Sequence, residues 1–115
     1  MATFYVTVDV QTAANLVSDE ILNGSVTGEM IDCYGIQTDD AHGVIVQVFE
    51  KHYYRAGNRL TLTVTIDNLQ GKTVVHTVGG GGGEGFFRFD WGAAESFEEV
   101  AQKALKPYIV PCHDL

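Results

Sequence analysis

Two histidines and a cysteine are the side chains of this sequence best suited to catalysis or metal binding. His52 and His76 lie in predicted strands that both flank the segment 59–67, so they could share one face of a sheet. A metal site would need them to converge with a carboxylate or a thiolate. A one-residue shift in strand pairing would move either ring to the other face. Cys33 would need a nearby histidine and an orienting group to act as a nucleophile, and its sequence neighbours supply neither. We predict no catalytic residue, no metal and no cofactor.

A run of glycines, residues 79–83 and 85, contains the string G-x-G-x-x-G at Gly80, Gly82 and Gly85. A dinucleotide site also needs a helix directly after this string, so that the pyrophosphate meets the helix N-terminus. Here the aromatic segment 86–91 follows, which we predict to be a strand, and no Lys-Ser or Lys-Thr pair closes a phosphate loop. We expect a flexible connection between two strands. The alternative is a backbone nest that binds a small anion beside Arg88.

The segment from Lys51 to Arg59 gathers three bases and two tyrosines around a predicted hairpin. Arginine and tyrosine are enriched at binding surfaces, because they provide a large contact area for little lost freedom. Such residues are also common as solvent-facing side chains near a hairpin end. The candidate interaction residues are Tyr53, Tyr54, Arg55, Arg59 and Arg88.

Charge is distributed unevenly along the 115 residues. Residues 1–50 contain eight acids and no Lys or Arg, whereas residues 51–115 contain seven of each sign, for a net charge of −8. This deficit of bases argues against binding to nucleic acid or to an anionic membrane surface. The sequence has neither an apolar run of membrane-spanning length nor a secretory signal. We therefore expect a cytoplasmic protein in which Cys33 and Cys112 are reduced and structural.

The apolar pattern predicts which elements must carry these residues. Strands are expected over 3–8, 25–34, 44–55, 59–67, 72–78 and 86–91. The strand 59–67 is the clearest, since Leu60 begins a strict alternation of apolar and polar residues. Apolar residues recur at helical spacing over about 11–22, and Asn23-Gly24 would end that helix. A second helix is predicted from a capping box at Ser96 and Glu99. Pro107 should terminate or kink it.

Short turns between strands favour antiparallel pairing, because parallel crossovers need a dozen or more residues. We predict an α+β fold in the order β-α-β-β-β-β-β-α. It has an antiparallel sheet of five or six strands, with two helices packed on one face. The length of 115 residues fits a single domain, 1–115, in which about 109–115 form a loose tail.

Four short segments resemble a known family. They are 21–26 (ILNGSV), 57–62 (GNRLTL), the glycine run leading into 86–89 (FFRF), and 95–98 (ESFE). Together they resemble a family of short uncharacterised bacterial proteins classed as a domain of unknown function. The resemblance covers most of the chain and implies a single bacterial domain. Its motifs are turns, caps and strand residues, and it supplies no catalytic residue.

Three functional hypotheses follow. The first is a non-enzymatic binding or protein-interaction module, including a homo-oligomer formed through its sheet or its edge, or by head-to-tail pairing of acidic and basic regions. The second is a binder of a small apolar ligand, in a helix-grip-like pocket between the C-terminal helix and the sheet. The third is a small enzyme, which would need residues such as His52, His76, Arg88 or Cys33 to converge in a cleft. The missing nucleophile–base, metal and phosphate signatures favour the first.

Overall fold

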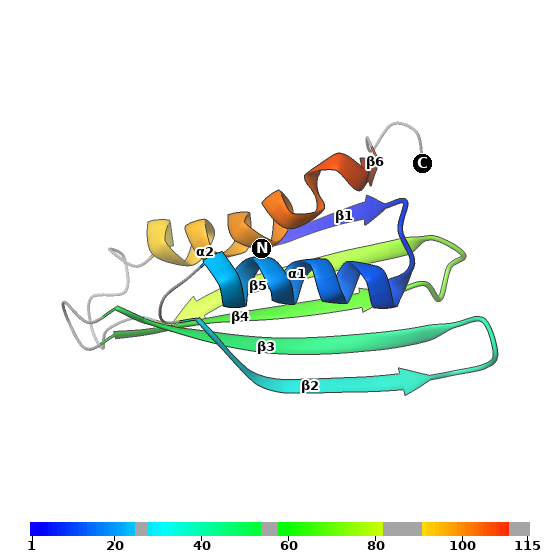
Figure 1. The fold of residues 1–115 in the computed structure, drawn as a ribbon, viewed down its shortest axis with the longest axis horizontal. Helices are drawn as coiled ribbons and strands as arrows, with labels where there is room; N and C mark the ends of the chain where they lie inside the picture. Colours follow the sequence, from blue (N-terminus) through cyan, green and yellow to red (C-terminus); the bar gives the residue numbers. More distant parts are fainter. Residues whose placement is uncertain (25–27, 54–57, 82–90, 111–115) are drawn as a thin grey trace.

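A six-stranded antiparallel sheet carries two helices on one of its faces (Figure 1). The computed structural model describes residues 1–24, 28–53, 58–81 and 91–110. The strands are β1 (Ala2–Val6), β2 (Glu29–Gln37), β3 (Gly43–Tyr53), β4 (Asn58–Asp67), β5 (Thr73–Gly81) and β6 (Ile109–Val110). The helices are α1 (Val10–Gly24) and α2 (Trp91–Leu105), and a 3-10 turn, η2 (Lys106–Tyr108), follows α2. The predicted α+β class, with an antiparallel sheet and two helices, is confirmed.

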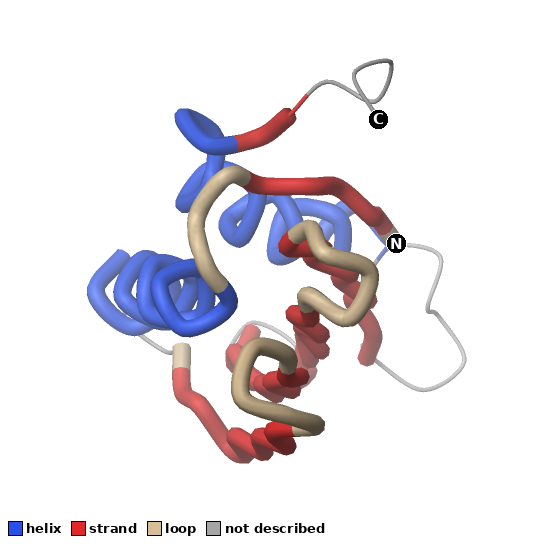
Figure 2. Tube along the Cα trace, turned by 90° about the vertical axis from the view of Figure 1, so that its right-hand side faces the viewer, coloured by secondary structure: helices blue, strands red, loops and turns tan. Residues whose placement is uncertain are grey.

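The strand order is β2-β3-β4-β5-β1-β6. Strands β2 to β5 form a meander in chain order, as the short turns predicted. Strand β1 pairs with β5 on one side and with β6 on the other. Seen along the sheet, the strands curve around the two helices (Figure 2). One face of the sheet is therefore covered, and on the other face the described residues form no helix.

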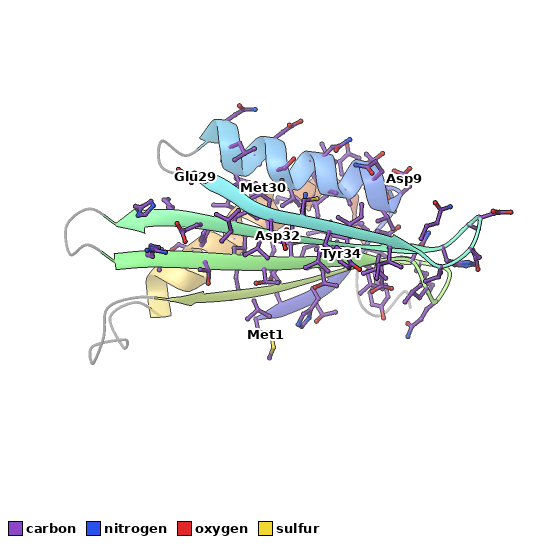
Figure 3. The ribbon with its side chains drawn as sticks, turned by 90° about the horizontal axis from the view of Figure 1, so that it is seen from below. Met1, Asp9, Glu29, Met30, Asp32 and Tyr34 are labelled. Carbon is purple, nitrogen blue, oxygen red and sulfur yellow. The ribbon has the colours of Figure 1, made fainter. Side chains whose placement is uncertain are left out.

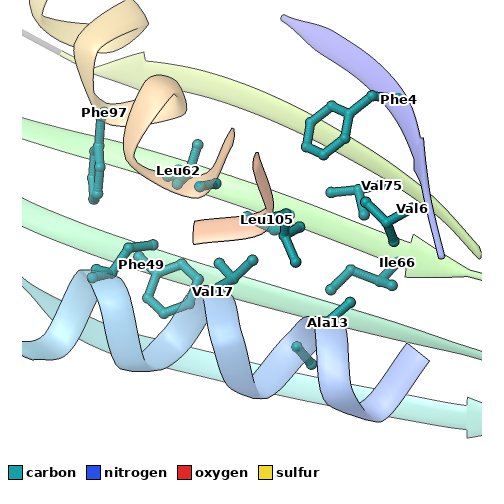
Figure 4. Close-up of a cluster of buried hydrophobic side chains, with 14 of the residues drawn as sticks. Phe4, Val6, Ala13, Val17, Phe49, Leu62, Ile66, Val75, Phe97 and Leu105 are labelled. Atoms are coloured by element: carbon teal, nitrogen blue, oxygen red, sulfur yellow. The ribbon is translucent and has the colours of Figure 1, made fainter. Parts of the chain in front are cut away.

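The core lies between the helices and the covered face (Figure 4). In β4 the alternation predicted from the sequence is observed: Leu60, Leu62, Val64 and Ile66 are buried, and the threonines between them are half-buried on the other face. The helices cover these side chains with an apolar stripe from α1 and another from α2. The helical core residues are Ala13, Ala14, Val17, Ile21, Phe97, Ala101 and Leu105.

Helix α1 begins where Asp9 caps it. The Asp9 carboxylate accepts a hydrogen bond of 3.0 Å from the backbone N–H of Thr12, which is one of the amides that a helix start leaves without a partner. The hydrogen bonds from Thr12 lower the pKa of Asp9. The helix ends at Gly24, as the Asn23-Gly24 pair predicted.

Helix α2 begins earlier than predicted, and the capping-box interpretation of Ser96 is wrong. Ser96 lies inside α2, which starts at Trp91. The reason is that a Ser followed by Glu three residues later also occurs within helices, so the spacing alone does not fix a start. Trp91, assigned to the last predicted strand, is helical, and residues 86–90 of that strand lie outside the described residues. The helix ends at Leu105, and Pro107 lies in η2, consistent with its predicted effect.

Two further segments differ from expectation. Ile109 and Val110, expected to belong to a loose tail, form β6 and pair with Val6 and Tyr5 of β1. The first glycines of the run, 79–81, continue β5 opposite residues 60–62 of β4 instead of forming a loop. Backbone pairing with β4 supplies the order that these glycines lack intrinsically. Glycines 82, 83 and 85 lie outside the described residues, as do residues 111–115.

Candidate functional site

The basic, aromatic hairpin is only partly described. Tyr53 is the last residue of β3, and its backbone pairs with Asn58. The Arg59 side chain is exposed, and its guanidinium lies 3.3 Å from a carboxylate oxygen of Glu50. The Glu50 carboxylate thus partly neutralises the positive charge of Arg59 within the same chain. Tyr54, Arg55 and Arg88 lie outside the described residues.

The histidines do not converge. His52 is opposite Arg59 and His76 is opposite Thr65, so both rings occupy the helix-free face of the sheet, as the sequence suggested. Six residues of β4 separate the two positions, which corresponds to about 20 Å along a strand. Each ring has its own neighbour: His52 lies 3.4 Å from the Glu50 carboxylate, and His76 lies 2.6 Å from the Thr3 hydroxyl. Within the described residues no group of three His, Cys, Asp or Glu side chains could hold a metal ion.

The predicted helix-grip space is filled. Phe97, Ala101 and Leu105 of α2 are buried against the sheet residues Leu62 and Val75. A groove of about 550 Å³ lies elsewhere, between the start of α1 and the turn that joins β2 to β3. It is lined by acids, amides, one imidazole and apolar side chains, with no Lys or Arg among the lining residues. Its lining includes Asp9, Val10, Ile36, Asp40, His42 and Ile45.

The turn beside this groove is held by Asp39. One oxygen of its carboxylate accepts hydrogen bonds from the backbone N–H groups of Ala41 and His42, both at 2.8 Å, and the His42 ring lies 2.8 Å away. The bond from Ala41, and next that from the His42 side chain, lower the pKa of Asp39. This arrangement is an ordinary Asp-anchored turn.

A buried carboxylate joins three separate parts of the chain. Glu98 of α2 is only 6% exposed. It accepts hydrogen bonds from the Met1 ammonium at 2.8 Å, the Thr77 hydroxyl at 3.0 Å and the Gly79 backbone N–H at 3.0 Å. Burial would raise the pKa of Glu98, but these three donors outweigh it and lower the pKa. With its hydrogen bonds made, this group stabilises the fold and offers no free reactive atom.

The helix-free face carries an apolar strip along β2 and β3. Residues opposite one another in an antiparallel pair share a face. Tyr34 is opposite Val46, and Ile36 is opposite Val44. Since Val46 is opposite Thr65 of β4, all of these side chains point away from the helices. Tyr34 is 58% exposed and Ile36 is 49% exposed, so this side of the sheet ends in uncovered apolar surface.

Strand β2 is itself an uncovered edge of the sheet. In the described part of the chain its only strand neighbour is β3, and every one of its nine residues is exposed except Met30, which is half-buried. The labelled side chains of Glu29, Asp32 and Tyr34 can be followed along it in Figure 3. A register shift between Met30 and Asp32 leaves Ile31 without an opposite residue in β3. One long row of backbone N–H and C=O groups therefore has no partner strand among the described residues.

Cys33 lies on this edge strand and is a free, exposed thiol. The sequence led us to expect a reduced, structural thiol, and its exposure leaves Cys33 without a core position; Cys112 lies outside the described residues. Across β3, Cys33 is opposite Gln47, whose amide donates to the Ala14 carbonyl at 3.0 Å. The edge was not singled out from the sequence, which predicted a strand over 25–34 but not its neighbours. The sequence did carry one signal for an exposed strand. Apolar residues continue after Asp32 as far as Ile36, directly before the polar turn at 37–42.

Comparison with known proteins identifies a family for this chain but gives no role for the edge. A family model described as a family of unknown function, DUF6054, matches residues 1–109. Comparison with curated proteins gave no significant match, and comparison with solved structures gave none either. Neither described helix has both the length and the apolar character that are needed to cross a membrane.

Proposed function

Since the chain belongs to DUF6054, a family of unknown function, we propose its role from its own surface: it is a non-enzymatic protein-interaction module that binds an extended segment along β2. The resemblance to a domain of unknown function is thereby confirmed, and a bacterial origin stays a prediction. The observation that carries the proposal is the exposure of β2 on both of its faces.

An added strand would use the unpaired backbone groups of β2 for its affinity. Its alternate side chains would lie beside Tyr34 and Ile36, which supply the exposed apolar area on the helix-free face. The chemistry of this edge thus suits an extended protein segment better than a compact small molecule. The separation of His52 from His76, and the hydrogen-bonded state of Glu98, favour this role over catalysis.

We also propose that the module is a single domain and acts in the cytoplasm. Both helices pack on the same sheet and share one core, which suits an independent folding unit. An exposed free thiol at Cys33 suits a reducing compartment. Fractionation of cells that carry a C-terminally tagged chain checks the location, and recovery outside the cytoplasmic fraction would contradict it.

A displayed library of random peptides tests the proposed function. At protein concentrations below any self-association, we expect selected peptides to slow hydrogen exchange of β2 backbone amides. The double variant Tyr34→Asp with Ile36→Asp should bind these peptides at least about tenfold more weakly, because charge replaces the apolar contacts. Leu69→Asp is the matched control, since Leu69 is as exposed as Ile36, at 49%, but lies in the turn after β4. Peptides that protect the start of α1 and the turn after β2 but leave the β2 amides unprotected, or no selected peptide at all, would overturn the proposal.

A further inference from the structure

We propose that the segment bound along β2 is β2 of a second copy of this chain, so that two sheets join antiparallel about Tyr34. This inference rests on the proposed function, because it names the partner of the same edge. It is carried by the shape of β2, the position of its charges and the shortness of the opposite edge.

The bulge limits which part of β2 can pair. Ile31 has no opposite residue in β3, so the regular part of the strand runs from Asp32 to Gln37. Pairing about Tyr34 sets residues 32–36 of the two copies opposite each other. Tyr34 then faces the partner's Tyr34, and Cys33 faces the partner's Gly35. Each pair lies on one face of the joined sheet, because positions an even number of residues apart share a face.

The charges of β2 disfavour pairing nearer the start of the strand. The strand has two acids, Glu29 and Asp32, and both lie toward its start, whereas residues 33–37 are uncharged. Pairing about Tyr34 brings the uncharged halves together and places Asp32 opposite the partner's Ile36. Pairing about Cys33 would instead make Asp32 a diagonal neighbour of the partner's Asp32, at about 7–8 Å. Pairing about Gly35 would join residues 33–37, which are uncharged too, but would set Tyr34 opposite the partner's Ile36. Cross-linking through a single cysteine at 34 separates the two registers, since only pairing about Tyr34 sets position 34 opposite itself.

The other edge of the sheet explains why the assembly would stop at two copies. Among the described residues, that edge consists of the two residues of β6 and of Ala2–Phe4 of β1, which β6 does not cover. Once the two β2 strands are paired, each end of the joined sheet offers only these short segments, in contrast to the nine residues of β2. The contact about Tyr34 is isologous, so a two-fold axis closes it.

Charge reversal at residue 34 tests the inference. We expect the wild-type chain to pass from monomer to dimer in sedimentation between about 1 μM and about 1 mM, as suits a contact smaller than a standard interface. Tyr34→Glu and Tyr34→Lys should each weaken the dimer at least about tenfold, because each places like charges directly opposite one another. An equimolar mixture of the two variants should dimerise again. Tyr34→Phe is the matched control and should dimerise as the wild type does.

The lysine variant also tests the register. If the strands paired about Cys33, the introduced ammonium group would face the partner's Asp32, and Tyr34→Lys would strengthen the dimer. Single cysteines at 33, 34 and 36, in a chain otherwise free of cysteine, provide a second measurement. We expect mild oxidation to cross-link the cysteine at 34 faster than those at 33 and 36, because only position 34 faces itself.

Three results would overturn the inference. The first is a wild-type chain that stays monomeric at every concentration. The second is a mixture of charge variants that does not associate. The third is a dimer that survives both Tyr34 variants but is lost in Arg55→Glu with Arg59→Glu, which would show head-to-tail pairing through the basic hairpin. A monomer that still binds peptides along β2 would refute the second copy alone, whereas a monomer without such binding would refute the proposed function too.

Discussion

The two edges of this sheet differ in what holds them in place. On one side, β6 is a two-residue strand beside β1, and the backbone N–H of Thr7 adds a hydrogen bond of 2.9 Å to the Tyr108 carbonyl. Strand β1 buries Phe4 and Val6 in the core. On the other side, β2 is nine residues long and contributes only the half-buried Met30 to the margin of the core. One edge is fixed by packing, and the other by backbone pairing with β3.

This difference suggests that one edge of the sheet serves stability and the other serves binding. A strand fixed by buried side chains cannot change its surface without loss of stability. A strand held mainly by its backbone can carry almost any side chain on its exposed faces, so its residues are available for recognition. The exposed tyrosine and isoleucines of β2 are therefore better explained by binding than by folding.

The largest expected effect is the difference in unfolding free energy between two variants, each of which removes an aromatic ring from one edge of the sheet. Phe4→Ala should lower the free energy of unfolding by about 3 kcal/mol or more, because it leaves a cavity in the core. Tyr34→Ala should lower it by roughly 0.5 kcal/mol or less, since that side chain is 58% exposed. Urea unfolding of the monomer measures both. Equal losses in the two variants would contradict the distinction between the edges.

A smaller loss of stability is expected when the hydrogen bonds between Glu98 and β5 are weakened. Glu98→Gln should cost about 1–3 kcal/mol, because the part-buried contact with the Met1 ammonium and the buried contact with the Thr77 hydroxyl lose their charged acceptor. Glu99→Gln is the control, since Glu99 is the exposed neighbour on the same helix. A loss of the same size in Glu99→Gln would show that helix charge, and not the loss of these contacts, causes the effect.

The same carboxylate predicts a pH dependence. The ordinary pKa of a glutamate is 4.5, and the pKa of Glu98 in the folded chain lies below it. Its contribution is therefore complete above about pH 4.5 and is lost as the pH falls through the folded pKa. We expect Glu98→Gln to reduce the slope of stability against pH in this acid range. Some slope should remain, because the pKa values of Asp9 and Asp39 are lowered too. An unchanged slope in the variant would contradict the role of Glu98.

The smallest effect concerns local opening at the edges. In dilute protein, backbone amides of β2 that face away from β3 should exchange with solvent much faster than those of Tyr5 and Val6 in β1, which have a strand on each side. In concentrated protein, the exchange of β2 amides should slow while that of β1 stays the same. Hydrogen exchange followed by NMR checks this, and protection of β2 that does not depend on concentration would contradict pairing between copies.

Local patterns predicted the fold well where burial sets the pattern. The alternation from Leu60 to Ile66 predicted β4, and the helical spacing around Val17 predicted α1. The start of α2 was predicted wrongly, because the capping signal at Ser96 is local and the helix extends beyond it. The strand character of Gly79 could not be read from glycine itself, since it depends on pairing with Leu62 of β4.

The candidate site was harder to predict because an edge is a property of the whole topology. The sequence around Cys33 and Tyr34 indicates a strand but does not say whether one or two strands flank it. The basic hairpin was predicted to be an interaction surface from its composition alone. Its described member Arg59 lies within 3.3 Å of Glu50, nine residues earlier in the chain, and only the strand register brings them together.

The position of β1 in the sheet also determines the order in which the chain can assemble during synthesis. The meander from β2 to β5 needs only neighbouring segments, but Phe4 of β1 is paired with Val75, and β6 follows only after α2. Contacts between such distant residues form late, because a long loop must close first. Strand β1 leaves the ribosome before the other strands of this sheet, yet it would be among the last to join it. Until residues 73–77 emerge, its apolar side chains have no partner strand and stay open to contact with other molecules.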